Sequence, residues 1–250
     1  FSAVLSKGNA TAKYVGGVGF QPDLVINATR SASQNRFVYD AIRGTSKELR
    51  TNQDNAEATN DGVTAFHPDG FSRGSSNDCN EDGTTYVDWC WDMGGSNASN
   101  SDGGITSTVR ANTTYGQSIV TYTGTGSAAS VGHGLDSSPE MVILKRRNSA
   151  EEWSVYHTGI NPGWKMYLNS TAAEADDSGN ETFGNLPSSI TSTTFGVGDH
   201  ARANASGSTY VAYCFHSVTG YSKFGKYSGD GSSDGSNAVT LGFEPAFVMI

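Results

Sequence analysis

The 250-residue sequence has few charged residues and no long hydrophobic run. Charged residues make up 16% of the chain, the net charge is -9, and no basic cluster is longer than Lys145-Arg146-Arg147. Because a surface that binds a phosphate backbone needs a basic face, this composition argues against nucleic-acid binding. No apolar run approaches the roughly eighteen residues of a membrane-spanning helix. We therefore expect neither a nucleic-acid partner nor membrane insertion.

Cysteine and histidine are also sparse. The three cysteines, Cys79, Cys90 and Cys214, are too few for a disulfide framework. The five histidines lie far apart, and none has zinc-ligand spacing to another histidine or to a cysteine. The pattern therefore indicates neither a disulfide scaffold nor a zinc centre.

The familiar catalytic motifs are missing as well. The chain has no Gly-x-Ser-x-Gly nucleophile turn, no phosphate-binding loop and no HExxH. A sandwich glycosidase would need two carboxylates close together, and the nearest approach is Glu151-Glu152. Adjacent strand residues, however, point to opposite faces. We predict a protein that is not an enzyme, with a sandwich hydrolase as the enzymatic alternative.

What the sequence does contain is a repeat of domain size. The stretch Tyr86–Trp91 returns as Tyr210–Phe215, each time after a Gly-x-Thr turn. Strand alternation would place Val87, Trp89 and Trp91 on one face, and we expect this to be a core strand used twice. Cys90 and Cys214 then fall on the opposite face, one in each copy.

Other landmarks repeat in the same order, which makes chance similarity a poor explanation. The apolar run at Leu24-Val25-Ile26 matches Met141-Val142-Ile143, and it occurs a third time within Gly242–Ile250. Asn52 corresponds to Asn169 by the same alignment. The sequence thus divides into two units and the beginning of a third.

The fold class follows from short β-branched and aromatic runs separated by Gly, Asn, Asp and Ser clusters, with no helix-period segment between them. We predict an all-β protein made of tandem antiparallel β-sandwiches. The expected organisation is a first sandwich over residues 1–95, a Gly/Ser/Asn linker over 96–114, a second sandwich over 115–220 and an incomplete third repeat over 221–250.

A calcium loop is one candidate site. Asp78, Asn80 and Asp82 place oxygen ligands at alternate positions before the turn residue Gly83. The closing Glu is absent, because Trp89 occupies its position. Ca²⁺ binding is weighed here against a solvated acidic hairpin, and no other cofactor is expected.

A carbohydrate platform is the other candidate, because an aromatic ring stacks on a sugar while amides bond its hydroxyls. Trp153 and Trp164 flank loops that contain Asn161 and Asn169. Trp153 also aligns with Phe37 of the first copy, which favours a shared core position. Both interpretations stay open at this point.

Several phrases carry a family resemblance: Pro22–Ile26, Asp40–Gly44, Tyr86–Trp91, Tyr122–Ser127 with Gly132–Leu135, and Tyr221–Gly225. Together they resemble a repeated domain of unknown function found in virion proteins of marine bacteriophages, notably cyanophages. The resemblance covers nearly the whole chain and implies a concanavalin-like or jelly-roll β-sandwich in a phage structural protein. It supplies no catalytic residues, and Asn27–Arg30 departs from it where a lysine often follows the apolar run.

From these observations we expect a non-enzymatic virion protein, such as a tail fibre, an appendage or a capsid decoration. Its expected partners are other virion proteins, further copies of itself and a host-surface glycan, and its expected location is the extracellular particle. The alternative is a glycan-binding adhesion module of a secreted bacterial protein.

Overall fold

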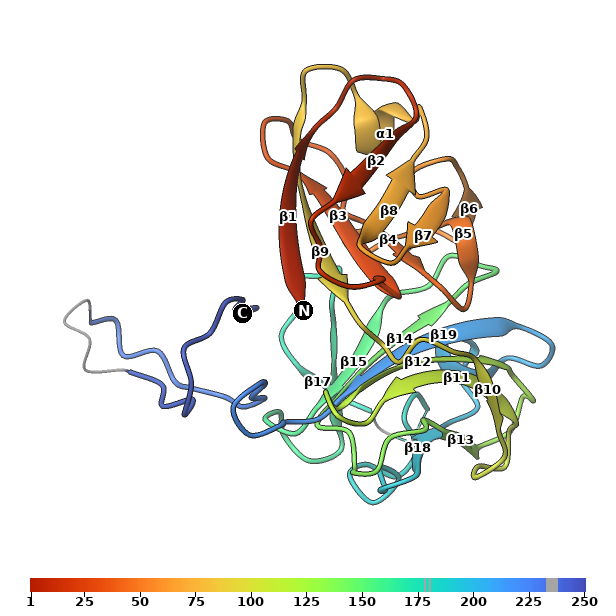
Figure 1. Cartoon of the computed structure of the whole chain (residues 1–250). Helices are drawn as coiled ribbons and strands as arrows, with labels where there is room; N and C mark the ends of the chain where they lie inside the picture. Colours follow the sequence, from red (N-terminus) through yellow and green to blue (C-terminus); the bar gives the residue numbers. More distant parts are fainter. Residues whose placement is uncertain (178, 180, 233–237) are drawn as a thin grey trace.

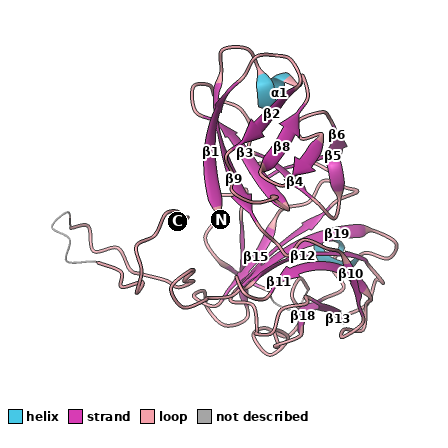
Figure 2. Cartoon of the chain, in the orientation of Figure 1, coloured by secondary structure: helices cyan, strands magenta, loops and turns pink. Residues whose placement is uncertain are grey.

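The computed structural model describes residues 1–177, 179, 181–232 and 238–250. The chain is nearly all β, with 38% strand and 4% helix, and its strand ladders are antiparallel. The all-β sandwich class predicted from the short apolar runs is confirmed. Figure 2 shows the two four-residue helices as minor caps on a body of strands.

The first unit consists of two sheets. Its elements are β1 (Ser2–Lys7), β2 (Lys13–Gly16), β3 (Leu24–Thr29), β4 (Phe37–Asp40), β5 (Gly44–Arg50), β6 (Ala58–Thr59), β7 (Ala65–His67), β8 (Gly70–Arg73), α1 (Asn77–Asn80) and β9 (Thr85–Trp91). The larger sheet has the strand order β1-β9-β3-β4-β5-β6, and the smaller has the order β2-β8-β7.

The second unit repeats this plan. Its elements are β10 (Ala98–Asn100), β11 (Ser107–Asn112), β12 (Gln117–Thr123), β13 (Ala129–Gly132), β14 (Met141–Arg146), β15 (Ser154–His157), β16 (Trp164–Tyr167), β17 (Ala175–Asp176), β18 (Thr194–Val197), α2 (Ala201–Asn204) and β19 (Thr209–Phe215). Within its larger sheet, the run β12-β19-β14-β15-β16-β17 reproduces the first sheet strand for strand. The smaller sheet pairs β13 with β18.

The pairing registers define which residues of the two units are counterparts. Val25 of β3 lies opposite Cys90 of β9, and Val142 of β14 lies opposite Cys214 of β19. The loops agree too, because the Arg30 amide donates to the Thr85 carbonyl (2.7 Å) just as the Arg147 amide donates to the Thr209 carbonyl (2.8 Å). The sequence repeat is therefore also a structural repeat.

The two units lie back to back, with the outer faces of their larger sheets against each other (Figure 1). One apolar cluster fills each sandwich, and a third cluster lies between the two units. This third cluster combines Leu24, Val38 and Leu49 of the first unit with Ile143 and Tyr213 of the second, among others. Both larger sheets therefore contribute apolar side chains to a core on each of their faces.

The expected linker over residues 96–114 contains strands instead. β10 and β11 pair with each other, and β11 pairs along its length with β12, so both belong to the eight-stranded sheet. The low apolar content was misleading because these two strands bury few apolar side chains. β10 is the exposed edge strand, and β11, which lies between β10 and β12, contributes Val109 to the core. The first sheet has no equivalent extension among the described residues, and β1 forms its edge.

The face of the repeated strand that carries Val87, Trp89 and Trp91 in the first copy is less buried there than the matching face in the second copy. In β9 the fully buried residues are Tyr86, Asp88 and Cys90, whereas Val87, Trp89 and Trp91 are only half-buried. In β19, by contrast, every residue after Thr209 is buried. Alternation located the two faces correctly, but it could not show that the first unit leaves part of its outer face open. The three cysteines are buried and free of disulfides, and Cys79 lies in α1.

The C-terminal segment leaves the second unit and returns toward Phe1 (Figure 1). Among the described residues after Phe215, no stretch forms a strand, and only an isolated bridge joins Val218 to Ser222. Phe247 places its ring 5.1 Å from that of Phe1 and 5.9 Å from that of Trp91. The third repeat thus stays a prediction from sequence.

Candidate binding surface

The predicted calcium ligands lie at a helical turn, not along an extended loop. Asp78 and Asn80 belong to α1, whose N-cap Ser76 accepts a hydrogen bond from the Asp78 amide (3.3 Å). The Asn80 side chain is buried, and it accepts from the Asn9 amide (3.2 Å) and donates to two backbone carbonyls (2.7 Å each). Asn80 is therefore engaged with backbone and is not presented as a ligand beside Asp82.

The counterpart of Asn80 has the same role, which explains why the position repeats while the acids do not. Asn204 of α2 accepts from the Thr125 amide (2.7 Å) and donates to the Ser127 carbonyl (2.5 Å). In each unit this asparagine fastens the chain that follows the first strand of the repeat, β1 or β12, to the short helix. Within the described ranges, no group of three or more His, Cys, Asp or Glu side chains is placed to hold a metal ion.

The predicted carbohydrate residues are dispersed, and Trp153 lies in a core. Its side chain is fully buried between the units, and its indole N–H donates to the Arg50 carbonyl (2.8 Å) and the Gln53 carbonyl (3.1 Å). A ring without exposed surface cannot serve as a sugar platform. The predicted match with Phe37 is also wrong, because Phe37 faces the interior of the first sandwich and Trp153 faces the other unit.

Backbone bonds identify the true counterpart of Trp153 as Arg36. The Trp153 amide donates to Asn169 Oδ1 (2.9 Å), and the Arg36 amide donates to Asn52 Oδ1 (2.9 Å). Asn169 thus has the same loop-fastening role as Asn52.

Asn161 and Trp164 lie at the far edge of the second unit. Trp164 begins β16 and is half-buried, and its amide donates to the Asn161 carbonyl (3.0 Å). The Asn161 backbone and side-chain amides both donate to the Glu174 carboxylate (2.8 and 2.7 Å). These two predicted residues are therefore neighbours, with a carboxylate that sequence reasoning missed.

Several side chains of the second unit bind the first. Arg110 pairs with Asp23, and Lys145 Nζ donates to the Asp54 carbonyl (3.2 Å). Three more belong to positions that repeat in the first unit. Arg147 bonds both oxygens of Glu57 (2.9 Å each), Trp153 binds the carbonyls described above, and the Tyr213 hydroxyl donates to Asp40 Oδ2 (2.7 Å). Burial acts to raise the pKa of Glu57, but the hydrogen bonds and charges of Arg147 and Arg43 outweigh it and lower the pKa. A bidentate arginine–carboxylate pair of this kind fixes orientation as well as adding energy.

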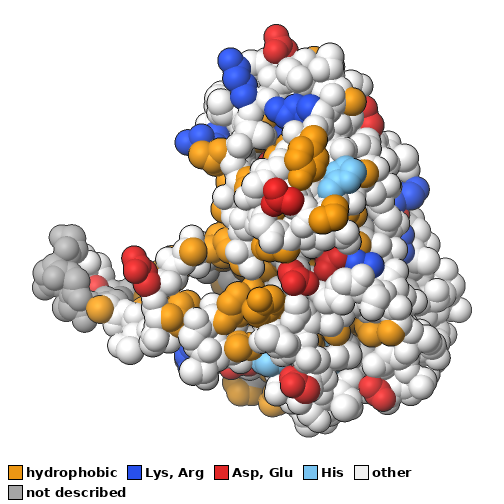
Figure 3. All heavy atoms as spheres, in the orientation of Figure 1, with side chains coloured by type: hydrophobic (Ala, Val, Ile, Leu, Met, Phe, Trp, Pro, Cys, Tyr) orange, Lys and Arg blue, Asp and Glu red, His pale blue; other side chains and the backbone are white. Residues whose placement is uncertain are grey.

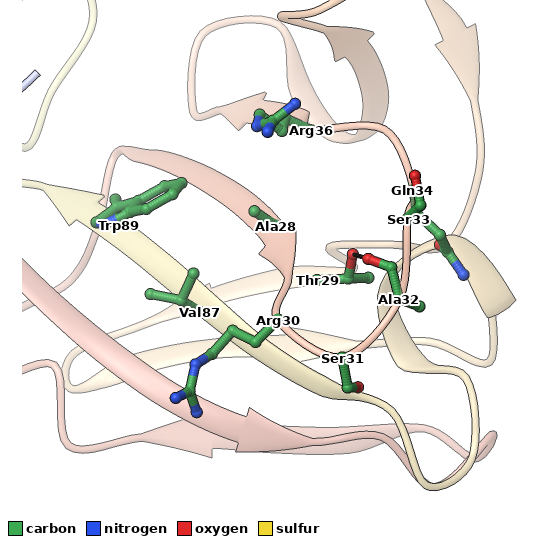
Figure 4. A pocket seen from close by; sticks show the side chains of 10 residues that line it. All are labelled: Ala28, Thr29, Arg30, Ser31, Ala32, Ser33, Gln34, Arg36, Val87 and Trp89. Carbon is green, nitrogen blue, oxygen red and sulfur yellow. Dashed lines mark hydrogen bonds between the residues drawn. The ribbon is translucent and has the colours of Figure 1, made fainter. Parts of the chain in front are cut away.

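An open cleft of about 610 Å³ lies on the first unit, over the outer face of β3 and β9. Figure 4 shows Ala28, Val87 and Trp89 on the strands, with Arg30 and Arg36 at the two ends of the loop that joins β3 to β4. Both arginine side chains are exposed, and neither has a hydrogen-bond or ion-pair partner in the described part of the chain. The cleft therefore combines a half-buried aromatic side chain with two free cations.

Hydrophobic side chains gather beside this cleft, where the two units and the C-terminal segment meet (Figure 3). Phe1, Trp91 and Phe247 belong to this patch. The sequence aligns Arg30 with Arg147, which is the one signal for the cleft that it contains. Only the structure shows that one of these arginines is paired and the other is free.

A family model described as a domain of unknown function (DUF7483) matches residues 1–250. Comparison with curated proteins and with solved structures gave no match. In the described part of the chain, no helix is long and apolar enough to cross a bilayer.

Proposed function

Because the chain belongs to the DUF7483 family of domains of unknown function, we propose its function from the packing of its own units. It is a non-enzymatic structural protein of a bacteriophage virion, acting as a tail fibre, an appendage or a capsid decoration. Its partners are other virion proteins, and its location is the extracellular particle.

The observation that carries this proposal is the apolar core between the units. Two sandwiches that share a buried interface form one stiff body, whereas domains joined only by a linker move independently. Val211, Tyr213 and Trp153 are buried in that interface, and bonds from Tyr213, Trp153 and Arg147 anchor it. A virion component that holds its neighbours in fixed positions or transmits force benefits from being a rigid body of this kind.

The buried acids support a structural role because each is committed to a cation of the scaffold. Arg73 pairs with Asp88, Arg110 with Asp23, and Lys165 with Asp177. An acid–base catalyst would need a carboxylate that is free to exchange a proton with substrate. The phage assignment itself is supported by the sequence phrases that resemble virion proteins.

The test is the composition of purified particles. Phage from the source of this sequence would be banded in caesium chloride, washed in high salt and digested for mass spectrometry. We expect peptides of this chain in the particle band at a fixed ratio to the major capsid protein. A chain found only in the soluble fraction would contradict the proposal.

A second candidate function is attachment to a host-surface glycan, either on the virion or as a secreted bacterial adhesion module. The observation that favours it is the half-buried Trp164 beside Asn161 and Glu174, because an aromatic face with polar neighbours suits a sugar. Retention on a glycan array that Trp164→Ala abolishes would support it. Binding by the wild-type chain that survives this substitution would reject the Trp164 site.

A further inference from the structure

The second unit binds the first through one face of its larger sheet, and the equivalent face of the first unit has no second sandwich against it. The second unit holds the first with Arg147, Trp153 and Tyr213. Their counterparts by strand register and loop position are Arg30, Arg36 and Trp89, and all three line the open cleft. The ring of Phe247 lies 6.0 Å from that of Trp89, so the C-terminal segment reaches the Trp89 end of this surface, and the unoccupied part is the part around Arg30 and Arg36.

The first-unit segment that is bound in this contact also has an equivalent in the second unit, and no other sandwich binds that equivalent. The second unit grips Arg50–Glu57, which joins β5 to β6. The matching connection between β16 and β17 is Tyr167–Glu174, and residues 170–173 are exposed. Glu57 lies one residue before β6, and Glu174 lies one residue before β17.

The charges of the two vacant surfaces are complementary. Glu57 is bound by two arginines, Arg43 and Arg147, whereas Glu174 accepts from Asn161 and has no cation partner among the described residues. Arg30 is exposed and likewise has no anion partner within the described ranges. Among the described residues, one chain therefore carries an arginine without an anion partner at the position of Arg147 and a carboxylate without a cation partner at the position of Glu57.

We propose that a second copy of this chain docks its Tyr167–Glu174 segment in the cleft of the first unit, with Arg30 bound to Glu174 of that copy. The contact repeats between copies the grip that already exists within the chain, and it continues an interface of known chemistry. Because the two docking surfaces differ, copies join head to tail, and the assembly is either a closed ring or an open filament.

This inference goes beyond the proposed function, and it does not depend on the virion assignment. A chain that associates in solution but is missing from purified particles would contradict only the virion proposal. A chain that is present in particles but monomeric at every concentration would contradict only the docking proposal.

The test is charge reversal followed by analytical ultracentrifugation of the full chain over a range of concentrations at low salt. Arg30→Glu alone places two carboxylates together, and Glu174→Arg alone places two arginines together. We expect each single variant to weaken association by more than about tenfold, because like charges at an interface are costly. Added salt should weaken the wild-type association.

An equimolar mixture of the two single variants provides the decisive measurement. In an alternating assembly, the carboxylate introduced by Arg30→Glu meets the guanidinium introduced by Glu174→Arg, and the unchanged Arg30 and Glu174 meet at the next contact. We expect the mixture to regain association to within about threefold of wild type, the level expected if the pairs are equivalent. Lys223→Glu, at an exposed residue that belongs neither to the lining of the cleft nor to Tyr167–Glu174, is the matched charge control and should leave association unchanged.

Three outcomes would overturn the proposal. The wild-type chain could stay monomeric at every concentration, or it could associate equally well as Arg30→Glu and Glu174→Arg. A monomeric chain could instead bind an acidic polysaccharide such as heparin in a way that Arg30→Glu abolishes, which would assign the cleft to a sugar acid. Circular dichroism and thermal melting of each variant would show that it is folded.

Discussion

The two units follow the same chain path, but they fill their sandwiches differently. In the first unit, Arg73 and Asp88 form a buried ion pair, and Asn27 donates to the same Asp88 oxygen (2.8 Å). The counterparts of Arg73, Asp88 and Asn27 in the second unit are Val197, Ala212 and Leu144, respectively, and all are buried in its apolar core. A common backbone therefore accepts either a polar or an apolar interior.

The comparison shows that the buried ion pair is not required by the fold. Removing charge from water is costly, and a well-packed apolar replacement is often neutral or stabilising. Arg73 also donates to the Cys79 carbonyl (2.8 Å) and lies over the Tyr86 ring, 5.0 Å from its centroid. The pair thus organises the region around α1, whereas the second unit organises the same region with apolar contacts.

The largest expected effect comes from breaking this pair. Asp88→Ala leaves Arg73 buried without its carboxylate, and we expect a loss of about 3–5 kcal/mol in the free energy of unfolding, measured by urea denaturation. The triple variant Asn27→Leu/Arg73→Val/Asp88→Ala copies the second unit and should recover most of that loss. A triple variant as unstable as Asp88→Ala would show that the two interiors are not interchangeable.

The next prediction concerns the outer faces of the two larger sheets, where Trp153 and Arg36 occupy equivalent positions. Trp153→Phe keeps a ring between the units but removes the indole N–H. The Gln53 carbonyl then loses this donor, and the Arg50 carbonyl keeps only the bond from the Gln53 amide (3.2 Å). We expect a cost of about 1–3 kcal/mol from thermal or urea unfolding. Arg36→Ala, at the counterpart position in the open cleft, should change stability by less than about 0.5 kcal/mol. Equal costs at the two positions would contradict the assignment of Trp153 to the grip.

A pH dependence separates Glu57 from its counterpart Glu174. Arg147 and Arg43 lower the pKa of Glu57 in the folded chain below its usual 4.5, so the unfolded chain binds more protons between those two values. The stabilisation that Glu57 contributes is fully present above its pKa in the unfolded chain. It is lost as the pH falls through the lower pKa of the folded chain. Allowing for screening, we expect about 1 kcal/mol.

The measurement is urea unfolding from about pH 7 down to about pH 3, a range that spans the usual carboxylate pKa. Glu57→Gln should be less stable than wild type at neutral pH, and the difference should shrink as the medium becomes acidic. Glu174→Gln should show no such pattern in dilute, monomeric protein. A Glu57→Gln difference that stays constant with pH would mean that the ion pair contributes nothing.

The smallest expected effect concerns calcium. Because Asn80 uses its amide on backbone groups of the first unit just as Asn204 does in the second, neither EDTA nor millimolar Ca²⁺ should shift the melting temperature. Differential scanning calorimetry with each addition provides the check. A clear stabilisation by Ca²⁺ that Asp78→Asn or Asp82→Asn removes would restore the calcium loop.

Much of the fold could be predicted from sequence because it depends on local pattern. The β-branched and aromatic runs located strands such as β3, β12, β14 and β19, and the repeat predicted that two units would share one plan. The candidate sites were predicted less well. Asn161 and Trp164 do lie together, whereas the side chains of Asn80 and Asn169 bond to backbone groups of neighbouring loops.

Alternation in a strand assigns residues to two faces, but it does not show what covers each face. The all-β class, the repeat and the strand faces could therefore be predicted from the amino-acid pattern. The folded chain was needed to show that β10 and β11 extend the second sheet, that Trp153 is buried between the units, and that Arg147 is paired whereas Arg30 has no partner among the described residues. Each of these depends on a contact between segments far apart in the chain, and the pattern of a single strand carries no record of its partner.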